Sequence, residues 1–183
     1  LLKENGLDGV TISLDSLKYL TNKKINPHSN LSKVIDSIYI ATDIFGSAKI
    51  NVVVMNNINS HEIVDIVNRF KNFNVEIRFI EFMDVGETND WNLERVYTSE
   101  RIHNDISKYY SLTKLKDPLS STANKWQLRD FSARIGYISS ITQPFCNSCN
   151  RARLSANGLF YTCLFATQGY NVLETLRSEP DTN

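Results

Sequence analysis

Three cysteines and two arginines share one short stretch, FCNSCNRARLSANGLFYTCLFA, which spans residues 145–166. It holds every cysteine of the 183-residue chain, Cys146, Cys149 and Cys163, with Arg151 and Arg153 directly after the second. Thiolates bind zinc and iron–sulfur clusters, and guanidinium groups bind phosphate through paired hydrogen bonds. The stretch therefore combines residues for a metal site with residues for an anionic ligand.

The number of thiols leaves three interpretations open. A structural zinc site takes four protein ligands, and a [4Fe–4S] cluster normally takes four thiolates. With three, a cluster keeps one iron that can accept an oxygen or nitrogen atom of a substrate. His28, His61 and His103 are remote in the sequence and are read as structural or surface residues. A cluster with an open iron, zinc with a distant fourth ligand, and free structural thiols all remain possible interpretations.

The two arginines alternate along an expected strand, so their side chains should point to the same side. Two guanidinium groups on one face suit a triphosphate, whereas the ordinary alternative is a solvated strand face. Three further candidates lie in or beside other expected strands. Taken alone, Ser13 is expected to be a hydroxyl bonded to the backbone, Lys49 a solvated lysine and Met83 a core-packing residue.

Composition limits the function classes. Lys+Arg and Asp+Glu balance at 20 each, and 42% of residues are hydrophobic. The charge balance argues against nucleic acid as a partner, and no apolar run is long enough to cross a membrane. Few, clustered cysteines fit a reducing compartment, so we expect a cytoplasmic protein. The opening LLKENG reads as the end of a helix, which predicts further sequence upstream.

The elements that position these residues alternate between strand and helix. Apolar patterns predict strands over Val10–Leu14, Lys49–Met55 (buried on both faces) and Val75–Phe82. Between them we expect a helix over Leu31–Phe45 and a second helix capped by Ser60. This order predicts parallel strands with right-handed crossovers, as in a doubly wound sheet or a (β/α) barrel. Residues 15–30 read as a polar loop.

The pattern changes after residue 86. A helix near Ser99–Tyr110 is followed by short β-like runs, and Asn157-Gly158 predicts a hairpin with positive φ at both turn positions. That hairpin would fold Cys163 back toward Cys146 and Cys149. We therefore divide the chain into an α/β part, residues 1–86, and a β-rich part, residues 87–183.

Four segments in the same order, VTISLDSL, KINVVVMNNIN, VEIRFIEFMDVGETNDW and the cysteine stretch, resemble the GTP 3′,8-cyclase family of radical S-adenosylmethionine enzymes. The resemblance covers essentially the whole chain. It implies an α/β fold: residues 1–86 form the C-terminal half of an incomplete (β/α)6 radical-SAM barrel, followed by a β-rich extension with an auxiliary cluster and the GTP site. The family's C-x-x-x-C-x-x-C motif for a first cluster is absent here and is expected on an upstream half.

The resemblance also implies an activity. Family members are lyases that convert GTP to 3′,8-cyclo-7,8-dihydro-GTP with a radical derived from S-adenosylmethionine, the first step of molybdenum cofactor biosynthesis. A second [4Fe–4S] cluster would sit on the upstream half. A homodimer is expected, a cyclic pyranopterin monophosphate synthase would act downstream, and the sequence does not identify the electron donor.

By the same resemblance, each candidate residue receives a role. The auxiliary [4Fe–4S] cluster is held by Cys146, Cys149 and Cys163; GTP is contacted by Lys49, Arg151, Ala152 and Arg153; and S-adenosylmethionine is contacted by Ser13 and Met83. Arg78 and Glu81 are further candidates for polar groups facing into the barrel. Two other functions stay as alternatives: a zinc-bearing interaction module, and a different radical enzyme with an auxiliary cluster.

Overall fold

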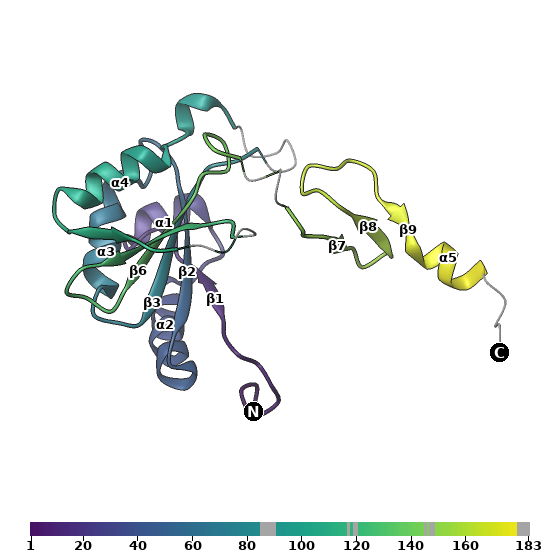
Figure 1. Cartoon of the computed structure of the whole chain (residues 1–183), viewed down its shortest axis with the longest axis horizontal. Helices are drawn as coiled ribbons and strands as arrows, with labels where there is room; N and C mark the ends of the chain where they lie inside the picture. The colour runs from purple at the N-terminus through teal and green to yellow at the C-terminus, as the bar shows by residue number, and fades with distance from the viewer. Residues whose placement is uncertain (85–90, 117, 119–120, 145, 147–148, 179–183) are drawn as a thin grey trace.

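The computed structural model describes residues 1–84, 91–116, 118, 121–144, 146 and 149–178. Within them the chain forms a six-stranded sheet with its helices, and beside it a smaller lobe of three strands and one helix (Figure 1). The mixed α/β class expected from the sequence is confirmed. No helix in these ranges is long and apolar enough to span a membrane.

Four neighbouring strands of the large sheet are parallel, as the strand–helix alternation predicts. The sheet order is β1-β2-β3-β6-β5-β4. The parallel strands are β1 (Thr11–Ser13), β2 (Ala48–Val54), β3 (Val75–Glu81) and β6 (Arg134–Ile138). Two antiparallel strands, β5 (Asn124–Leu128) and β4 (Leu112–Lys114), extend the sheet beyond β6. The predicted boundary at residue 86 lies outside the described residues, and strands from both sides of it join this one sheet.

One helix of the sheet domain has the bounds that its sequence predicts, and the others differ from the prediction. Helix α2 (Leu31–Phe45) has the predicted bounds because Asn30 caps it, accepting the Lys33 N–H at 3.2 Å, and Gly46 ends it with a φ of 75°. A 3-10 turn, Ser60–Glu62, precedes the short helix α3. The remaining helices of the sheet domain are α1 (Tyr19–Ile25), α3 (Ile63–Phe70) and α4 (Ser99–Ser107). Helix α1 lies in the segment predicted as a loop.

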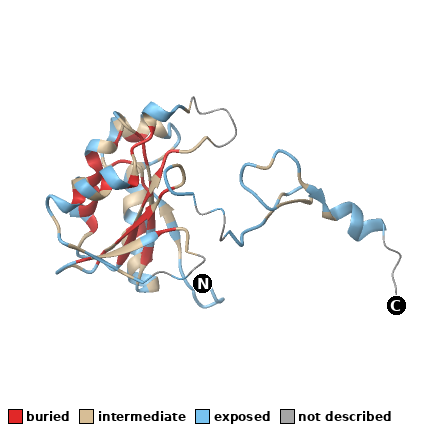
Figure 2. Cartoon of the chain, turned by 45° about the horizontal axis from the view of Figure 1, so that its top comes forward, coloured by how far each residue is buried: buried red, intermediate tan, exposed pale blue. Residues whose placement is uncertain are grey.

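The two faces of the sheet have different chemistry. On the face toward the helices, Ile50, Ile77 and Ile135 are each 0% exposed, and Figure 2 shows the buried residues gathered around the strands and their covering helices. The opposite face, called the open face here, is polar. It carries the following alternate residues of β2, β3 and β5: Lys49, Asn51, Glu76, Arg78 and Lys125. The prediction that β2 is buried on both faces is wrong, because Lys49 is exposed and Asn51 only half-buried.

An ion-pair network lies on the open face. Arg78 Nε is 2.5 Å from Glu76 Oε1, and Lys125 Nζ is 3.8 Å from Glu76 Oε2. Gly136 on β6 lies beside the Arg78 side chain, and a Cβ built on it would be 3.4 Å from Arg78 Cγ. The polar character of this face is therefore built into the strand alternation.

The small lobe is a hairpin extended by a third strand and a helix. It contains β7 (Arg153–Leu154), β8 (Leu159–Tyr161), β9 (Tyr170–Asn171) and α5 (Val172–Ser178). The predicted hairpin forms, but its turn differs from the prediction because Gly158 has a positive φ (78°) and Asn157 does not. The Ser155 N–H donates to the Leu159 carbonyl at 2.9 Å, which closes a three-residue loop ending in a left-handed glycine.

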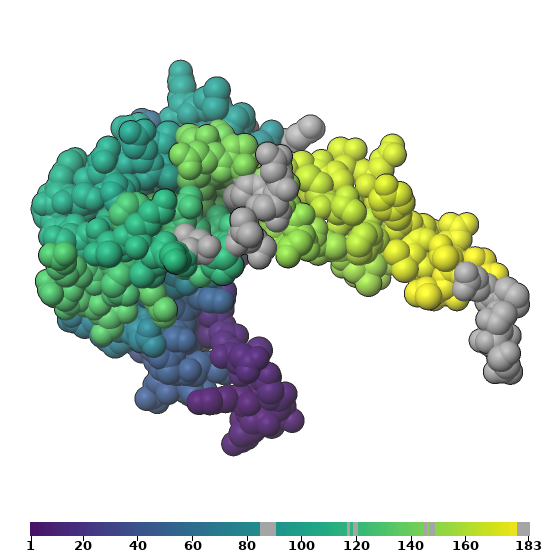
Figure 3. All heavy atoms as spheres, in the orientation of Figure 1, coloured from purple at the N-terminus to yellow at the C-terminus, as the bar shows by residue number. Residues whose placement is uncertain are grey.

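The lobe has no buried core among its described residues. Beyond Ser139 none of the described residues is classed as buried, and Leu154, Tyr170 and Leu176 are 66–72% exposed. The space-filling view shows the lobe projecting beside the sheet domain (Figure 3). Structures this small usually need a metal, a disulfide or a partner surface in addition to their own apolar contacts.

A buried amide ties the ends of β1 and β2 together and generates the first prediction. Asn59 is 2% exposed; its Oδ1 accepts the Met55 N–H at 2.7 Å, and its Nδ2 donates to the Asp15 and Val53 carbonyls at 2.7 and 2.8 Å. In Asn59→Asp, a carboxylate oxygen would face two carbonyl oxygens. We expect the free energy of unfolding to fall by roughly 3 kcal/mol.

Urea denaturation of the full-length protein measures this effect. The matched control is Asn57→Asp, at an exposed turn residue whose positive φ (59°) aspartate also tolerates. The control should stay within about 0.5 kcal/mol of wild type. Equal losses in the two variants would contradict a special role for the Asn59 amide.

Candidate functional site

A cavity of about 390 Å³ gathers most of the predicted site residues. All three cysteines, Arg151, Arg153 and Met83 line it. The rest of its lining comes from the carboxyl ends of β3 and β6, the residues that follow β6, the segment just before β5 and the lobe, namely Ile80, Thr122, Ile138, Ser140, Pro144, Thr162, Leu164 and Phe165. The cavity thus lies where the parallel strands end, the usual position of binding residues in barrel and open α/β folds.

Local backbone turns bring the thiols to this cavity. The Cys149 N–H donates to the Cys146 carbonyl at 3.2 Å, which brings the backbones of these two cysteines together. The β7–β8 hairpin reverses the chain, and Cys163 lies two residues beyond β8 rather than on it. All three thiols are free and exposed. The three cysteines therefore line one cavity, while their convergence on a common metal group stays a prediction.

Within the described residues, hydrogen bonds reach the sulfur atoms of Cys149 and Cys163. Arg151 Nη2 lies 3.3 Å from Cys149 Sγ, and the Phe165 N–H lies 3.4 Å from Cys163 Sγ. The backbone N–H and guanidinium of Arg151 lower the pKa of the Cys149 thiol below its usual value. This shift favours the thiolate, which is the form that binds metals.

The donor set fits a thiolate-bound metal group. Among the described lining residues, the three cysteines supply the only thiols, and no histidine or carboxylate lies beside them. N–H groups directed at sulfur are typical of iron–sulfur sites, where they tune the cluster. In the described part of the chain, no three His, Cys, Asp or Glu side chains are arranged closely enough to hold a single metal ion. The thiols therefore share a cavity without converging on one point.

Three predicted residues lie elsewhere. Ser13, at the end of β1, is exposed and pairs with Asn51, and it does not line the cysteine cavity. Lys49 is exposed near the start of β2, beside a small cavity of about 230 Å³ formed with residues 8–11 and 47–48. Ala152 is exposed between the two arginines. Six of the nine predicted site residues thus share one cavity.

The two further candidates on β3, Arg78 and Glu81, point to opposite faces of the sheet. Arg78 lies on the polar open face, as expected for an inward-facing group. The prediction for Glu81 is wrong, because this residue is 0% exposed on the helix side, where its carboxylate accepts four hydrogen bonds. The alternation of side chains along a strand could have shown this, because residues an odd number of positions apart, such as Arg78 and Glu81, point to opposite faces.

The histidines lie outside the cysteine cavity. His103 stacks on Trp126 with ring centroids 4.6 Å apart, and its Nδ1 is 3.2 Å from the Tyr137 hydroxyl oxygen. These three residues line a separate cavity of about 320 Å³ next to α4. Burial lowers the pKa of His103. His28 and His61 are exposed.

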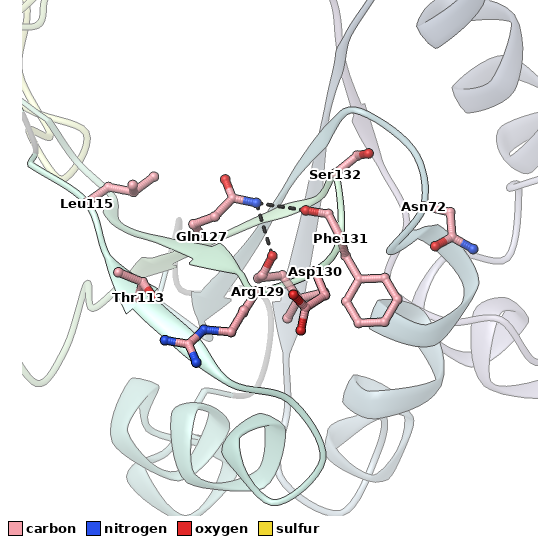
Figure 4. A pocket seen from close by; sticks show the side chains of 9 residues that line it. Asn72, Thr113, Leu115, Gln127, Arg129, Asp130, Phe131 and Ser132 are labelled. Carbon is pink, nitrogen blue, oxygen red and sulfur yellow. Dashed lines mark hydrogen bonds between the residues drawn. The ribbon is translucent and has the colours of Figure 1, made fainter.

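Another cavity, about 590 Å³, is an open depression at the β4–β5 edge and contains no cysteine among its described lining residues (Figure 4). Its centre is the Gln127 amide, whose Nε2 donates to the Leu128, Phe131 and Ala133 carbonyls at 3.1, 2.9 and 3.2 Å. These bonds hold the turn between β5 and β6, which is a sufficient structural reason for this polar group.

The cysteine cavity falls in a segment with known relatives. Residues 75–183 match the family described as Molybdenum Cofactor Synthesis C. The chain belongs to this family. It is 38% identical over 179 residues to the GTP 3′,8-cyclase of Aquifex aeolicus and 36% identical over 180 residues to those of Staphylococcus epidermidis and Staphylococcus aureus.

The match covers 97% of this chain but only 53–56% of those relatives. The chain therefore spans about half the length of the curated relatives it matches. All the described lining residues of the cysteine cavity lie within the matched segment, residues 75–183.

The His103 environment generates a prediction on acid stability. Because burial holds the folded-state pKa of His103 below its ordinary 6.5, the folded state favours the neutral ring. Stability from His103 is therefore complete above about pH 6.5 and is lost as the pH falls through the lower folded pKa. We expect wild type to lose more stability between pH 8 and pH 5 than His103→Gln, whose side chain does not titrate.

Thermal or urea unfolding at several pH values measures this difference. His28→Gln is the matched control, since the His28 side chain is exposed. The control should follow wild type at every pH. Parallel stability curves for wild type and His103→Gln would show that His103 titrates as it does in the unfolded chain, contrary to this account.

Proposed function

We propose that the chain is the C-terminal part of a GTP 3′,8-cyclase, the radical S-adenosylmethionine enzyme that opens molybdenum cofactor biosynthesis. One observation carries the proposal: three cysteines and two arginines, separated along the chain, line a single cavity at the carboxyl ends of β3 and β6. The names of the relatives support the same activity. The alternation of parallel strands and helices supports a barrel segment as the scaffold.

Cys146, Cys149 and Cys163 would hold a [4Fe–4S] cluster. Such a cluster, when bound by three thiolates, offers one iron with a free position for an oxygen or nitrogen atom of the substrate base. Zinc is less suited to this donor set, because a structural zinc site needs a fourth protein ligand and the described lining provides only thiols of the zinc-binding types. The guanidinium of Arg151 lowers the pKa of the Cys149 thiol, which would favour its thiolate form.

Arg151 and Arg153 would bind the anionic part of GTP. Both line the cavity with the cysteines, so a nucleotide whose base approaches the thiols could place its phosphates against them. Arginine keeps its charge at any physiological pH and makes paired hydrogen bonds to phosphate oxygens. Because the whole chain carries no net charge, this positive character is local to the site. Ala152 would contribute only backbone contacts.

The remaining residues would contact ligands shared with the upstream half. Met83 lies in the cysteine cavity and would pack against S-adenosylmethionine. Ser13 and Lys49 belong to the open face, and we infer that this face lines the ligand space, with Ser13 toward S-adenosylmethionine and Lys49 toward GTP. The first cluster, the homodimer and the supply of electrons all belong to the full-length protein.

The metal assignment gives a direct prediction. Full-length protein reconstituted anaerobically should lose about four iron atoms and four sulfides per chain when Cys146, Cys149 or Cys163 is replaced by serine, since each variant removes one of only three thiolates. Iron and acid-labile sulfide assays measure the loss. Stoichiometric zinc without sulfide in wild type, unchanged by reconstitution, would favour the zinc-bearing interaction module instead.

The nucleotide assignment gives a second prediction. Arg151→Ala or Arg153→Ala in the full-length protein should weaken GTP binding by about ten- to a hundredfold, because a charge-assisted hydrogen bond contributes about 1.5–3 kcal/mol. Cluster iron should stay near the wild-type level, since arginine is not a ligand. Arg→Lys should restore binding only in part, because lysine lacks the planar fork.

Titration calorimetry with GTP, with iron counted in each sample, makes the comparison. Arg129→Ala is the matched control, because Arg129 is an exposed arginine beside a different cavity. GTP affinity in both alanine variants equal to that of the control would remove the arginines from the nucleotide site. A different radical enzyme with an auxiliary cluster would then be the better interpretation.

A further inference from the structure

Glu81 is a fully buried carboxylate at the last position of β3. Its Oε1 accepts the Ser99 N–H at 2.8 Å and the Thr142 hydroxyl at 2.6 Å. Its Oε2 accepts the N–H groups of Ile141 and Thr142, each at 2.9 Å. Both oxygens therefore take two hydrogen bonds, and every donor belongs to a segment remote from β3 in the sequence.

The four bonds join three parts of the fold. Ser99 is the first residue of α4, so its N–H lies at the positive end of that helix. Ile141 and Thr142 belong to the segment between β6 and Cys146. Glu81 itself lies two residues before Met83. A single side chain thus connects the strand end, the helix start and the approach to the first cysteine.

The charge of Glu81 is stabilised by these donors. Burial alone would raise its pKa, but the Thr142 hydroxyl and the N–H groups of Ser99, Thr142 and Ile141 outweigh that effect and lower the pKa below the ordinary value. The carboxylate is therefore ionised at neutral pH and acts only as an acceptor. It fixes donors in a geometry that a neutral amide cannot reproduce.

The segments that Glu81 holds are walls of the cysteine cavity. Ile80, its neighbour on β3, lines the cavity, as does Met83. From the other segment, Ser140 and Pro144 line it on either side of the residues bonded to Glu81. The lobe has no buried residue of its own among those described. Of the chain that leads from β6 to the cysteines, the segment 139–144 is therefore the part that is attached to the sheet, through its hydrogen bonds to Glu81.

We propose that Glu81 is a positioning residue for the metal and nucleotide site. It holds residues 141–142 against the ends of β3 and α4, so that Cys146 and Cys149 face Met83 across the cavity. The inference rests on the proposed function for what the cysteines bind. The attachment of residues 141–142 to the sheet stands on the hydrogen bonds alone.

Two substitutions in the full-length protein test this role. In Glu81→Gln, whichever position the new NH₂ takes, it meets the N–H of Ser99 or the two N–H groups of Ile141 and Thr142. Thr142→Val removes a single donor and keeps the side-chain shape, whereas Thr142→Ser keeps the hydroxyl and should restore the wild-type result. Glu62→Gln is the matched control: Glu62 is also 0% exposed, and its Oε2 accepts the Ser16 hydroxyl and the Leu17 N–H at 2.7 and 3.0 Å, far along the chain from the cysteines.

Amide hydrogen exchange of the metal-free protein is the first measurement. We expect residues 140–143 to exchange about tenfold faster or more in Glu81→Gln and Thr142→Val, the effect of losing a charge-assisted hydrogen bond. Glu62→Gln should accelerate exchange near residues 16–18 only. Unchanged exchange at residues 140–143 in Glu81→Gln would overturn the proposal whatever the protein binds.

Iron and sulfide content and the reduced-state spin-resonance spectrum form the second measurement. Glu81→Gln and Thr142→Val should lower the iron held by the three cysteines or change its spectrum, while Thr142→Ser and Glu62→Gln match wild type. Faster exchange with unchanged iron and spectrum would leave Glu81 with a purely structural role and overturn the proposal. General unfolding of both Glu81→Gln and Thr142→Val would overturn it as well, because the carboxylate would then support the whole domain. A wild type that binds no iron would refute the proposed function, and the exchange result would still decide the attachment.

Discussion

A buried carboxylate at the end of β3 is the interaction on which the arrangement of the site depends. Glu81 accepts hydrogen bonds from α4 and from the segment that leads to Cys146, and it lies behind the cavity wall formed by Ile80 and Met83. Beyond that segment the described residues of the lobe contain no buried side chain. The position of the cysteines therefore follows from one polar anchor on the sheet and from whatever the three thiols bind.

The two faces of the sheet explain why a site forms at this end. Apolar residues on one face pack under the helices, so the scaffold is rigid where the parallel strands finish. The opposite face carries Glu76, Arg78 and Lys125, charges that a closed core would not accommodate. On the proposed function, this polar face would line the ligand space. The cysteine cavity then lies at the boundary between rigid sheet and lightly packed lobe.

Local signals in the sequence predict much of this structure, while contacts between distant segments account for what they miss. Helix α2 could be predicted because its apolar period and Gly46 agree, and the β7–β8 hairpin could be predicted from Asn157-Gly158. Helix α1 was missed because YLTNKKI is polar and leaves Tyr19 and Leu20 exposed. The strand β4, the pairing of β5 within the large sheet and the orientation of Glu81 depend on partners far along the chain, which no local pattern specifies.

The most direct test of a single metal and nucleotide site is the effect of GTP on the cluster itself. The spin-resonance spectrum of the reduced cluster held by Cys146, Cys149 and Cys163 would be recorded in full-length protein with and without GTP. The account predicts that GTP shifts this spectrum, and that in Arg151→Ala a higher GTP concentration is needed to produce the same shift. A spectrum unaffected by saturating GTP, in protein that binds GTP normally, would contradict the central claim that the thiols and the arginines form one site.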